Sequence, residues 1–129
     1  DRSYSRALEE IREGRKQSHW MWYIFPQIVG LGLSSTSRFY AIADLEEARA
    51  YMQHPMLGAH MIEICGVLLG LSANDAEDVM GYPDDLKLRS SMTLFSQAVP
   101  SVKIFQQVLD KYFDGKMDQN TLEILGEHA

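Results

Sequence analysis

Apolar side chains recur along this chain at helical spacing, and capping residues divide them into short runs. Tyr4, Leu8 and Ile11 stand three or four positions apart, which is the period of one helix face. Gly14 follows where a C-terminal cap belongs. Later runs keep the same period, so further helices are expected at residues 18–25, 35–43, 45–54, 55–71, 72–81, 84–98, 100–115 and from 118 onward.

The aromatic run after Ser18 admits two interpretations. One is a short helix capped by Ser18 and closed by Pro26 just beyond its end. The other is a strand, because aromatic residues favour pleated surfaces. No other segment offers a partner strand of matching quality, so a helix is the preferred interpretation.

Local signals also mark the ends of the later helices. Asp44 with Glu47 makes a start that resembles a capping box, and that helix stops before Pro55. Asp84 or Asp85 is expected to open the helix at 84–98. The inner face of that helix is predicted to carry Leu88, Met92 and Phe95.

Residues 55–71 carry the broadest apolar stripe and predict a central buried helix. The chain shows no repeat, no low-complexity tract and no break in composition. The pattern therefore predicts an all-α protein whose residues 1–129 form a single-domain compact bundle of about seven or eight short helices.

Charge and composition narrow the classes of function. With 12 basic and 18 acidic residues, the chain carries a formal charge of −6, which argues against nucleic-acid binding through a basic face. One cysteine, Cys65, suits a reducing compartment. No apolar run approaches the ~20 residues that span a bilayer. A soluble cytoplasmic protein without a membrane partner is predicted, and the start at Asp1 suggests that a segment precedes it.

Residues 15–27 form the first candidate site. On a helix, His19 and Trp22 would share one side, with Trp20 on another. Cations next to aromatic rings can hold a nucleotide, since rings stack on the base and cations meet the phosphate. The plainer interpretation is that the aromatic side chains fill the core. The candidate ligand-binding residues of this segment are Arg15, Lys16, Trp20, Trp22 and Gln27.

Residues 83–95 form the second candidate. The helix side opposite its apolar face would present cations and hydroxyls as an anion-binding edge. Serine and threonine are mediocre helix formers for a plain exposed surface. A capped amphipathic helix with a solvated polar face is the alternative, in which Asp85 could pair with Arg89. The candidate ligand-binding residues are Lys87, Arg89, Ser90, Ser91 and Thr93.

Other chemistry is sparse. The four histidines and the cysteine show no metal-ligand spacing, so neither a metal nor a cofactor is predicted. Cys65 lies in an apolar helix and is expected to be a buried, inert thiol. Adjacent acidic pairs such as Glu9 and Glu10 are expected to be solvated faces or caps.

Three motifs resemble a bacterial family known as domain of unknown function 1810. They are "GRKQSHWMWYIFPQIVGLG", "YAIADLEEARAYMQHPMLG" and "PDDLKLRSSMTLF", and the likeness extends from about Tyr4 to Leu125. The resemblance implies a small all-helical protein and a further N-terminal helix before residue 1. Family members are sometimes labelled calpastatin, but a compact, repeat-free chain does not suit that disordered inhibitor. A fold-level likeness to helical proteins that process ADP-ribose derivatives implies a ligand of that kind.

Two hypotheses follow, and they leave open whether the protein is an enzyme. In the first, the two segments form one site for a phosphate- or nucleotide-containing anion. His19 acts there as general acid or base, assisted by Asp84 or Asp85, and lies within about 10–12 Å of Arg89 across a pocket. In the second, the same polar residues hold helix ends and loops together in a non-catalytic interaction module.

Overall fold

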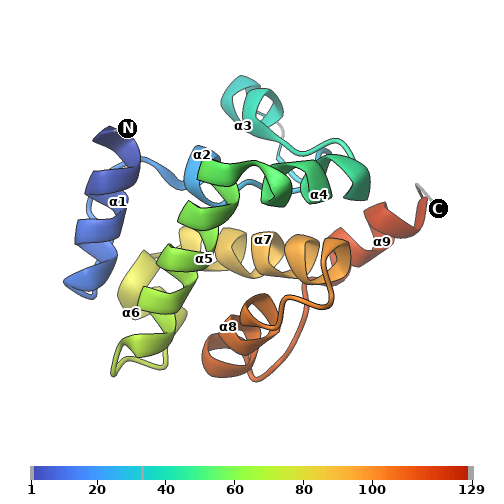
Figure 1. Cartoon of the computed structure of the whole chain (residues 1–129). Coiled ribbons are helices and arrows are strands. Elements are labelled where there is room, and N and C mark those ends of the chain that lie inside the picture. Colours follow the sequence, from blue (N-terminus) through green and yellow to red (C-terminus); the bar gives the residue numbers. More distant parts are fainter. Residues whose placement is uncertain (1, 33, 128–129) are drawn as a thin grey trace.

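The computed structural model describes residues 2–32 and 34–127. This part of the chain contains nine helices (Figure 1). They are α1 (Arg2–Arg12), α2 (Met21–Ile24), α3 (Ser35–Tyr40), α4 (Leu45–Gln53), α5 (Pro55–Gly70), α6 (Ala76–Met80), α7 (Asp84–Ala98), α8 (Ile104–Phe113) and α9 (Gln119–Glu127). Over these residues the only β-type pairing is an isolated bridge between Ile28 and Ile42. The predicted all-α, single-domain class is confirmed, with slightly more helices than expected.

The structure confirms the cap predicted for α4. Asp44 accepts a hydrogen bond from the backbone N–H of Glu47 (2.8 Å), and the Glu47 carboxylate accepts one from the N–H of Ala43 (2.8 Å). This reciprocal pair satisfies two backbone donors that the first helical turn leaves open. At the other end, His54 starts α5 directly, because its Nδ1 accepts from the backbone of Met56 and Leu57.

The cap predicted for α2 is wrong, whereas α7 begins at Asp84 as predicted. α2 is a single turn that begins at Met21, and the Ser18 hydroxyl donates to Glu10 instead of capping it. The N-cap position of α7 is Pro83, and Asp84 and Asp85 lie in the first helical turn without a side-chain cap. Acidic side chains in that turn still suit the helix dipole.

The helix at the centre of the bundle is α7. It packs against α4, α6, α8 and α9, and every side chain from 90 to 96 is buried (Figure 1). The predicted inner face of Leu88, Met92 and Phe95 is fully buried. Because neighbours surround α7, its serines and threonine are enclosed as well.

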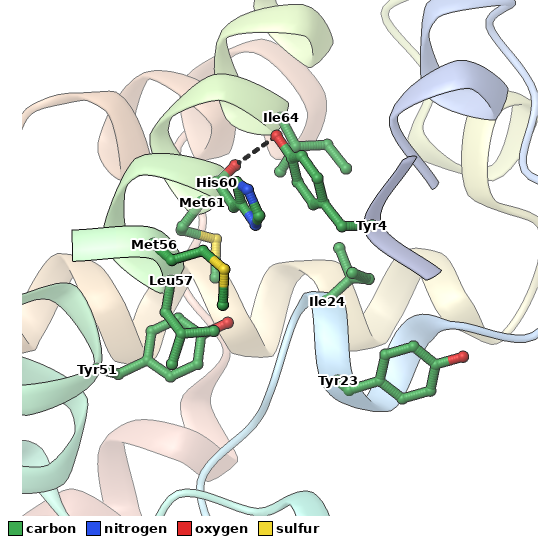
Figure 2. Close-up of a pocket in the computed structure, with 9 residues that line it drawn as sticks. All are labelled: Tyr4, Tyr23, Ile24, Tyr51, Met56, Leu57, His60, Met61 and Ile64. Carbon is green, nitrogen blue, oxygen red and sulfur yellow. Dashed lines mark hydrogen bonds between the residues drawn. The ribbon is translucent and has the colours of Figure 1, made fainter. Parts of the chain in front are cut away.

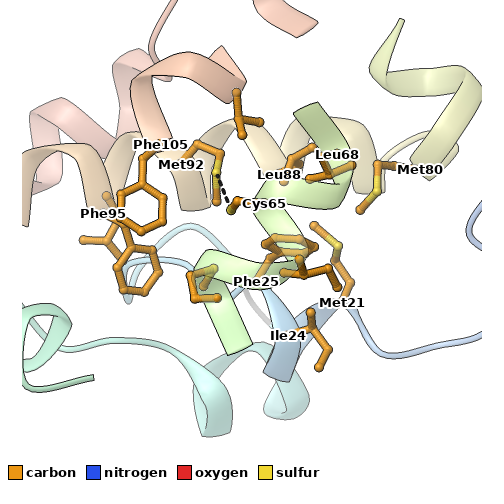
Figure 3. Packing of buried hydrophobic residues seen from close by; sticks show 14 of the residues in the cluster. Met21, Ile24, Phe25, Cys65, Leu68, Met80, Leu88, Met92, Phe95 and Phe105 are labelled. Carbon is orange, nitrogen blue, oxygen red and sulfur yellow. Dashed lines mark hydrogen bonds between the residues drawn. The ribbon is translucent and has the colours of Figure 1, made fainter. Parts of the chain in front are cut away.

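The second core helix, α5, packs against α1, α4 and α8. Its buried stripe includes Met61, Ile64 and Leu68, as the apolar pattern predicts. Figure 3 shows Cys65 of α5 facing Met92 of α7, with 3.7 Å between the two sulfur atoms. The two helices therefore meet in one continuous apolar core.

Close packing also fixes the corner between α4 and α5. A Cβ atom added at Gly58 would lie 2.1 Å from the carbonyl oxygen of Met52. Only glycine permits this approach of two backbones. This corner places Tyr51 of α4 and the start of α5 near α1 and α2, and a cavity lies between these four helices. A second cavity lies beside it, between α1 and residues 18–23.

Candidate functional site

The two candidate segments lie against each other. Lys16 Nζ is 2.8 Å from Asp84 Oδ2, and Lys87 Nζ is 3.3 Å from Asp84 Oδ1. The Lys87 ammonium also lies 3.9 Å from the centre of the Trp22 ring. Asp84 therefore holds one lysine from each segment, and we call this the Lys16–Asp84–Lys87 cluster.

The charged groups of this cluster are already paired with one another. The side chain of Lys16 is only 7% exposed, and its ammonium also donates to the backbone carbonyl of Ser18 (2.6 Å). A buried cation that already has a carboxylate partner is poorly placed to recruit a ligand phosphate. Asp84 already pairs with two lysines, so its carboxylate is not available to assist His19.

Glu10 is the polar residue of this region that the sequence did not single out. Its buried carboxylate accepts hydrogen bonds from the backbone N–H groups of Gln17 and Ser18, from the Ser18 hydroxyl and from Trp20 Nε1. Burial alone would raise the pKa of Glu10, but these donors outweigh it and lower the pKa to about 2. Nothing in the acidic pair with Glu9 signals this role, because residues 17–20 enclose Glu10 only in the folded chain.

The two tryptophans, both predicted as ligand-binding residues, lie in different environments. Trp20 is 1% exposed and its Nε1 donates to Glu10 (2.9 Å), so it cannot stack on a ligand. Trp22 is only partly buried, and the Lys87 ammonium lies over its ring. The physical reason is that the helix starts at Met21, so that the non-helical backbone of Trp20 turns its indole toward the core.

The hydroxyl groups of α7 do not form an anion-binding edge. Ser90 donates to the carbonyl of Leu86, and Thr93 donates to the carbonyl of Arg89 while accepting from the N–H of Asp118. The hydroxyl of Ser91 is buried without a partner among the described residues. Packing of α7 against its neighbours encloses all three side chains.

Arg89, Asp85 and the remaining candidates lie elsewhere. The nearest acidic atom to the Arg89 guanidinium is Asp118 Oδ1 (3.8 Å), and Asp85 Oδ1 and Arg89 Nε have no hydrogen-bond partner within the described chain. Arg89 lines an open hollow with residues 116–120. Arg15 is exposed, and Gln27 lines a narrow cleft beside Trp22.

His19 faces a different cavity, between α1 and the segment before α2. This basic cavity has a volume of about 120 Å³. It is lined by Arg2, Ser3, Arg6, Ser18, His19, Trp20 and Tyr23. The side chains of Arg2, Arg6 and His19 are exposed and form no ion pair or hydrogen bond with the described residues. The structure thus brings His19 together with two arginines of α1, while Arg89 lines a separate hollow.

A second cavity opens beside the first, between α1, α2, α4 and α5 (Figure 2). This aromatic cavity has a volume of about 170 Å³ and is lined by Tyr4, Tyr23, Ile24, Tyr51, Met56, Leu57, His60, Met61 and Ile64. The Tyr4 and His60 rings stack with 3.6 Å between their centres. The Tyr4 hydroxyl donates to Glu63 and approaches the His60 carbonyl, which holds both rings in place.

Among residues 2–32 and 34–127, no three histidine, cysteine or acidic side chains gather as a metal site. No helix in that part of the chain combines the length and apolar character that crossing a membrane requires.

The fold and these cavities define a small all-helical domain with two adjoining cavities at one corner. The chain belongs to the family described as "Protein of unknown function (DUF1810)", whose model matches residues 1–125. It is similar to the conserved hypothetical protein Rv1873 from Mycobacterium tuberculosis, with 45% identity and a TM-score of 0.93 over 95% of this chain and 88% of that one. No curated protein matches the chain.

Proposed function

We propose that the protein reversibly binds a small phosphate-containing molecule in the basic cavity. One observation carries the proposal: Arg2, Arg6 and His19 converge on a cavity of about 120 Å³ and have no partner among the described residues. Their donors are therefore available to a ligand. Guanidinium groups suit a phosphate, because their planar N–H donors match its oxygens in pairs.

The local charge supports an anion at this place despite the net charge of −6. Arg2 and Arg6 are one helical turn apart on α1, and His19 faces them from the following segment. Glu9 and Glu13 line a neighbouring open hollow, to which Arg6 and Ser18 of the basic cavity also contribute. Among the described residues, none that lines the basic cavity carries a carboxylate.

The proposed ligand is still the anionic molecule predicted from the sequence. Its proposed site is now the basic cavity, and no longer the contact between residues 15–27 and 84–93. Lys16 and Lys87 both pair with Asp84, whereas Arg2 and Arg6 have no ion-pair partner among the described residues. His19 becomes a ligand-binding residue in this proposal. Its role as a general acid or base stays a prediction, and no described carboxylate pairs with it. A cytoplasmic location, suited to a single cysteine, also stays a prediction.

A non-catalytic structural role for the signature residues is the second candidate. It is favoured by the internal pairing of Lys16, Asp84 and Lys87 and by the bond between Thr93 and the Asp118 backbone. In that case those residues stabilise the fold, and the basic cavity binds nothing in particular.

Titration with inorganic phosphate, followed by the histidine ring signals in NMR, separates the two candidates. We expect the His19 signal to move with saturation, and the affinity to fall about tenfold or more in Arg6→Gln, because one charged donor pair is lost. Arg12→Gln is the matched control, since Arg12 is exposed on the same helix and does not line the cavity. An unmoved His19 signal, or equal weakening in both variants, would reject the anion site.

A further inference from the structure

The basic and aromatic cavities are neighbours that share walls. Tyr23 lines both of them. α1 also contributes to both, with Tyr4 facing the aromatic cavity and Arg2 and Arg6 facing the basic one. Figure 2 shows the Tyr23 hydroxyl pointing away from the side chains of α5. It donates to the backbone carbonyl of His19, so a single side chain connects the two cavities.

The walls of the aromatic cavity suit a planar ring. Tyr4, Tyr51 and His60 contribute aromatic rings to the lining, and Met56 and Met61 contribute thioether side chains. Aromatic rings and methionine sulfur make favourable contacts with another ring, and methionine adapts to its shape. The volume of about 170 Å³ exceeds the roughly 150 Å³ of an engineered apolar cavity that binds benzene.

The cavity also offers polar groups that the fold leaves unused. The Tyr51 hydroxyl and the His60 ring nitrogens have no hydrogen-bond partner among the described residues. Burial raises the pKa of Tyr51 to about 12, so its hydroxyl keeps its proton and can donate. A few polar groups within an apolar wall are typical of a small-molecule site.

We propose that one ligand occupies both cavities, with a planar ring in the aromatic cavity and a phosphate in the basic cavity. The inference rests on the proposed phosphate site and adds the class of molecule that carries the phosphate. A short spacer in the ligand joins the ring to the phosphate and lies beside Tyr23, which lines both cavities. Ribose is such a spacer between the base and the phosphate of a nucleotide. Nucleotides and arylalkyl phosphates share this chemistry, and the test distinguishes them.

The experiment compares adenosine monophosphate, phenethyl phosphate, adenosine and inorganic phosphate by calorimetry and by NMR of the histidine rings. His19 reports on the basic cavity and His60 on the aromatic cavity, while His54, which caps α5, is the internal control. We expect a ring phosphate to move both His19 and His60 and to bind about tenfold tighter or more than inorganic phosphate, because ring burial adds to anion binding. The tighter of the two ring phosphates identifies the source.

Variants at Met56 test where the ring sits. Met56 is 50% exposed at the aromatic cavity, so Met56→Trp can narrow it without disturbing the core, and Met56→Leu is the matched control. We expect Met56→Trp to remove the tenfold gain in affinity for a ring phosphate and to leave the affinity for inorganic phosphate unchanged. Met56→Leu keeps an apolar side chain of similar size and should retain most of the gain.

Each contrary result has a distinct meaning. A ring phosphate that binds no tighter than inorganic phosphate and moves only His19 overturns the shared ligand but leaves the phosphate site. Adenosine that binds as tightly as adenosine monophosphate, with no response to phosphate, overturns both. If the gain in affinity over inorganic phosphate survives Met56→Trp and the His60 NMR signal does not move, the ring lies outside the aromatic cavity. That result also overturns the inference.

Discussion

Glu10 shows how one buried charge shapes the candidate site. Its carboxylate accepts hydrogen bonds from Gln17, Ser18 and Trp20, which follow it in the chain by seven to ten positions. These bonds hold the segment before α2 against α1. His19 lies within that segment, so Glu10 places the imidazole opposite Arg2 and Arg6.

Replacing this carboxylate should destabilise the protein in a way that depends on pH. The pKa of Glu10 is lowered from 4.5 to about 2, so its stabilising contribution is present above about pH 4.5 and is lost as the pH falls toward 2. We expect Glu10→Gln to lower the free energy of unfolding by about 2–3 kcal/mol near pH 7. The difference should shrink toward pH 2, as measured by urea unfolding.

Glu9→Gln is the matched control, because Glu9 is the exposed neighbour on the same helix. We expect it to change the free energy of unfolding by no more than about 0.5 kcal/mol. A Glu10→Gln effect that is equally large at all pH values would contradict a charge-dependent role.

At the scale of elements, the contact between α7 and the segment before α2 depends on a charge cluster. Asp84 stands in the first turn of α7 and pairs with Lys16 and Lys87. The Lys16 pair is shorter and its lysine is more buried. It should therefore contribute more to stability than the partly exposed pair within α7.

A double-mutant cycle measures this difference. We expect Asp84→Asn to cost about 2 kcal/mol of unfolding free energy, because it leaves the buried Lys16 ammonium without its carboxylate. The coupling of Asp84 with Lys16, measured with Lys16→Met, should be about 1–2 kcal/mol. The coupling with Lys87, measured with Lys87→Met, should stay near 0.5 kcal/mol. Equal couplings would show that burial of Lys16 does not matter.

At the scale of the whole molecule, α5 and α7 share one apolar core with Cys65 near its centre. Cys65 is 0% exposed and contacts Met92, and burial raises the pKa of its thiol well above the usual range (Figure 3). A thiol in this position is neither ionised nor accessible in the native state.

We therefore expect thiol reagents to modify Cys65 only when the whole core opens. The modification rate in native buffer should be limited by unfolding, and it should rise with urea in parallel with the fraction of unfolded protein. Protein in high urea, which should react at once, serves as the reference. Rapid labelling of the native protein would indicate a local opening between α5 and α7.

Several features were predictable from sequence because they depend on residues close together in the chain. The capping box of Asp44 and Glu47 spans three positions, and the buried face of α7 follows from its helical period. The roles of Trp20 and Trp22 were not predictable in this way. They depend on where α2 begins and on Glu10, which the local pattern did not mark as buried.

The sequence by itself determined the all-helical class, most helix positions and the inert cysteine, since helical period and local caps act within a few residues. Only the tertiary structure decided which polar groups are free. Packing around α7 buried Ser90, Ser91 and Thr93, and Asp84 paired with both lysines. The packing of α1 against residues 18–23 left Arg2, Arg6 and His19 without a partner among the described residues, beside an aromatic cavity. Such pairing depends on contacts between distant segments, which local patterns do not specify.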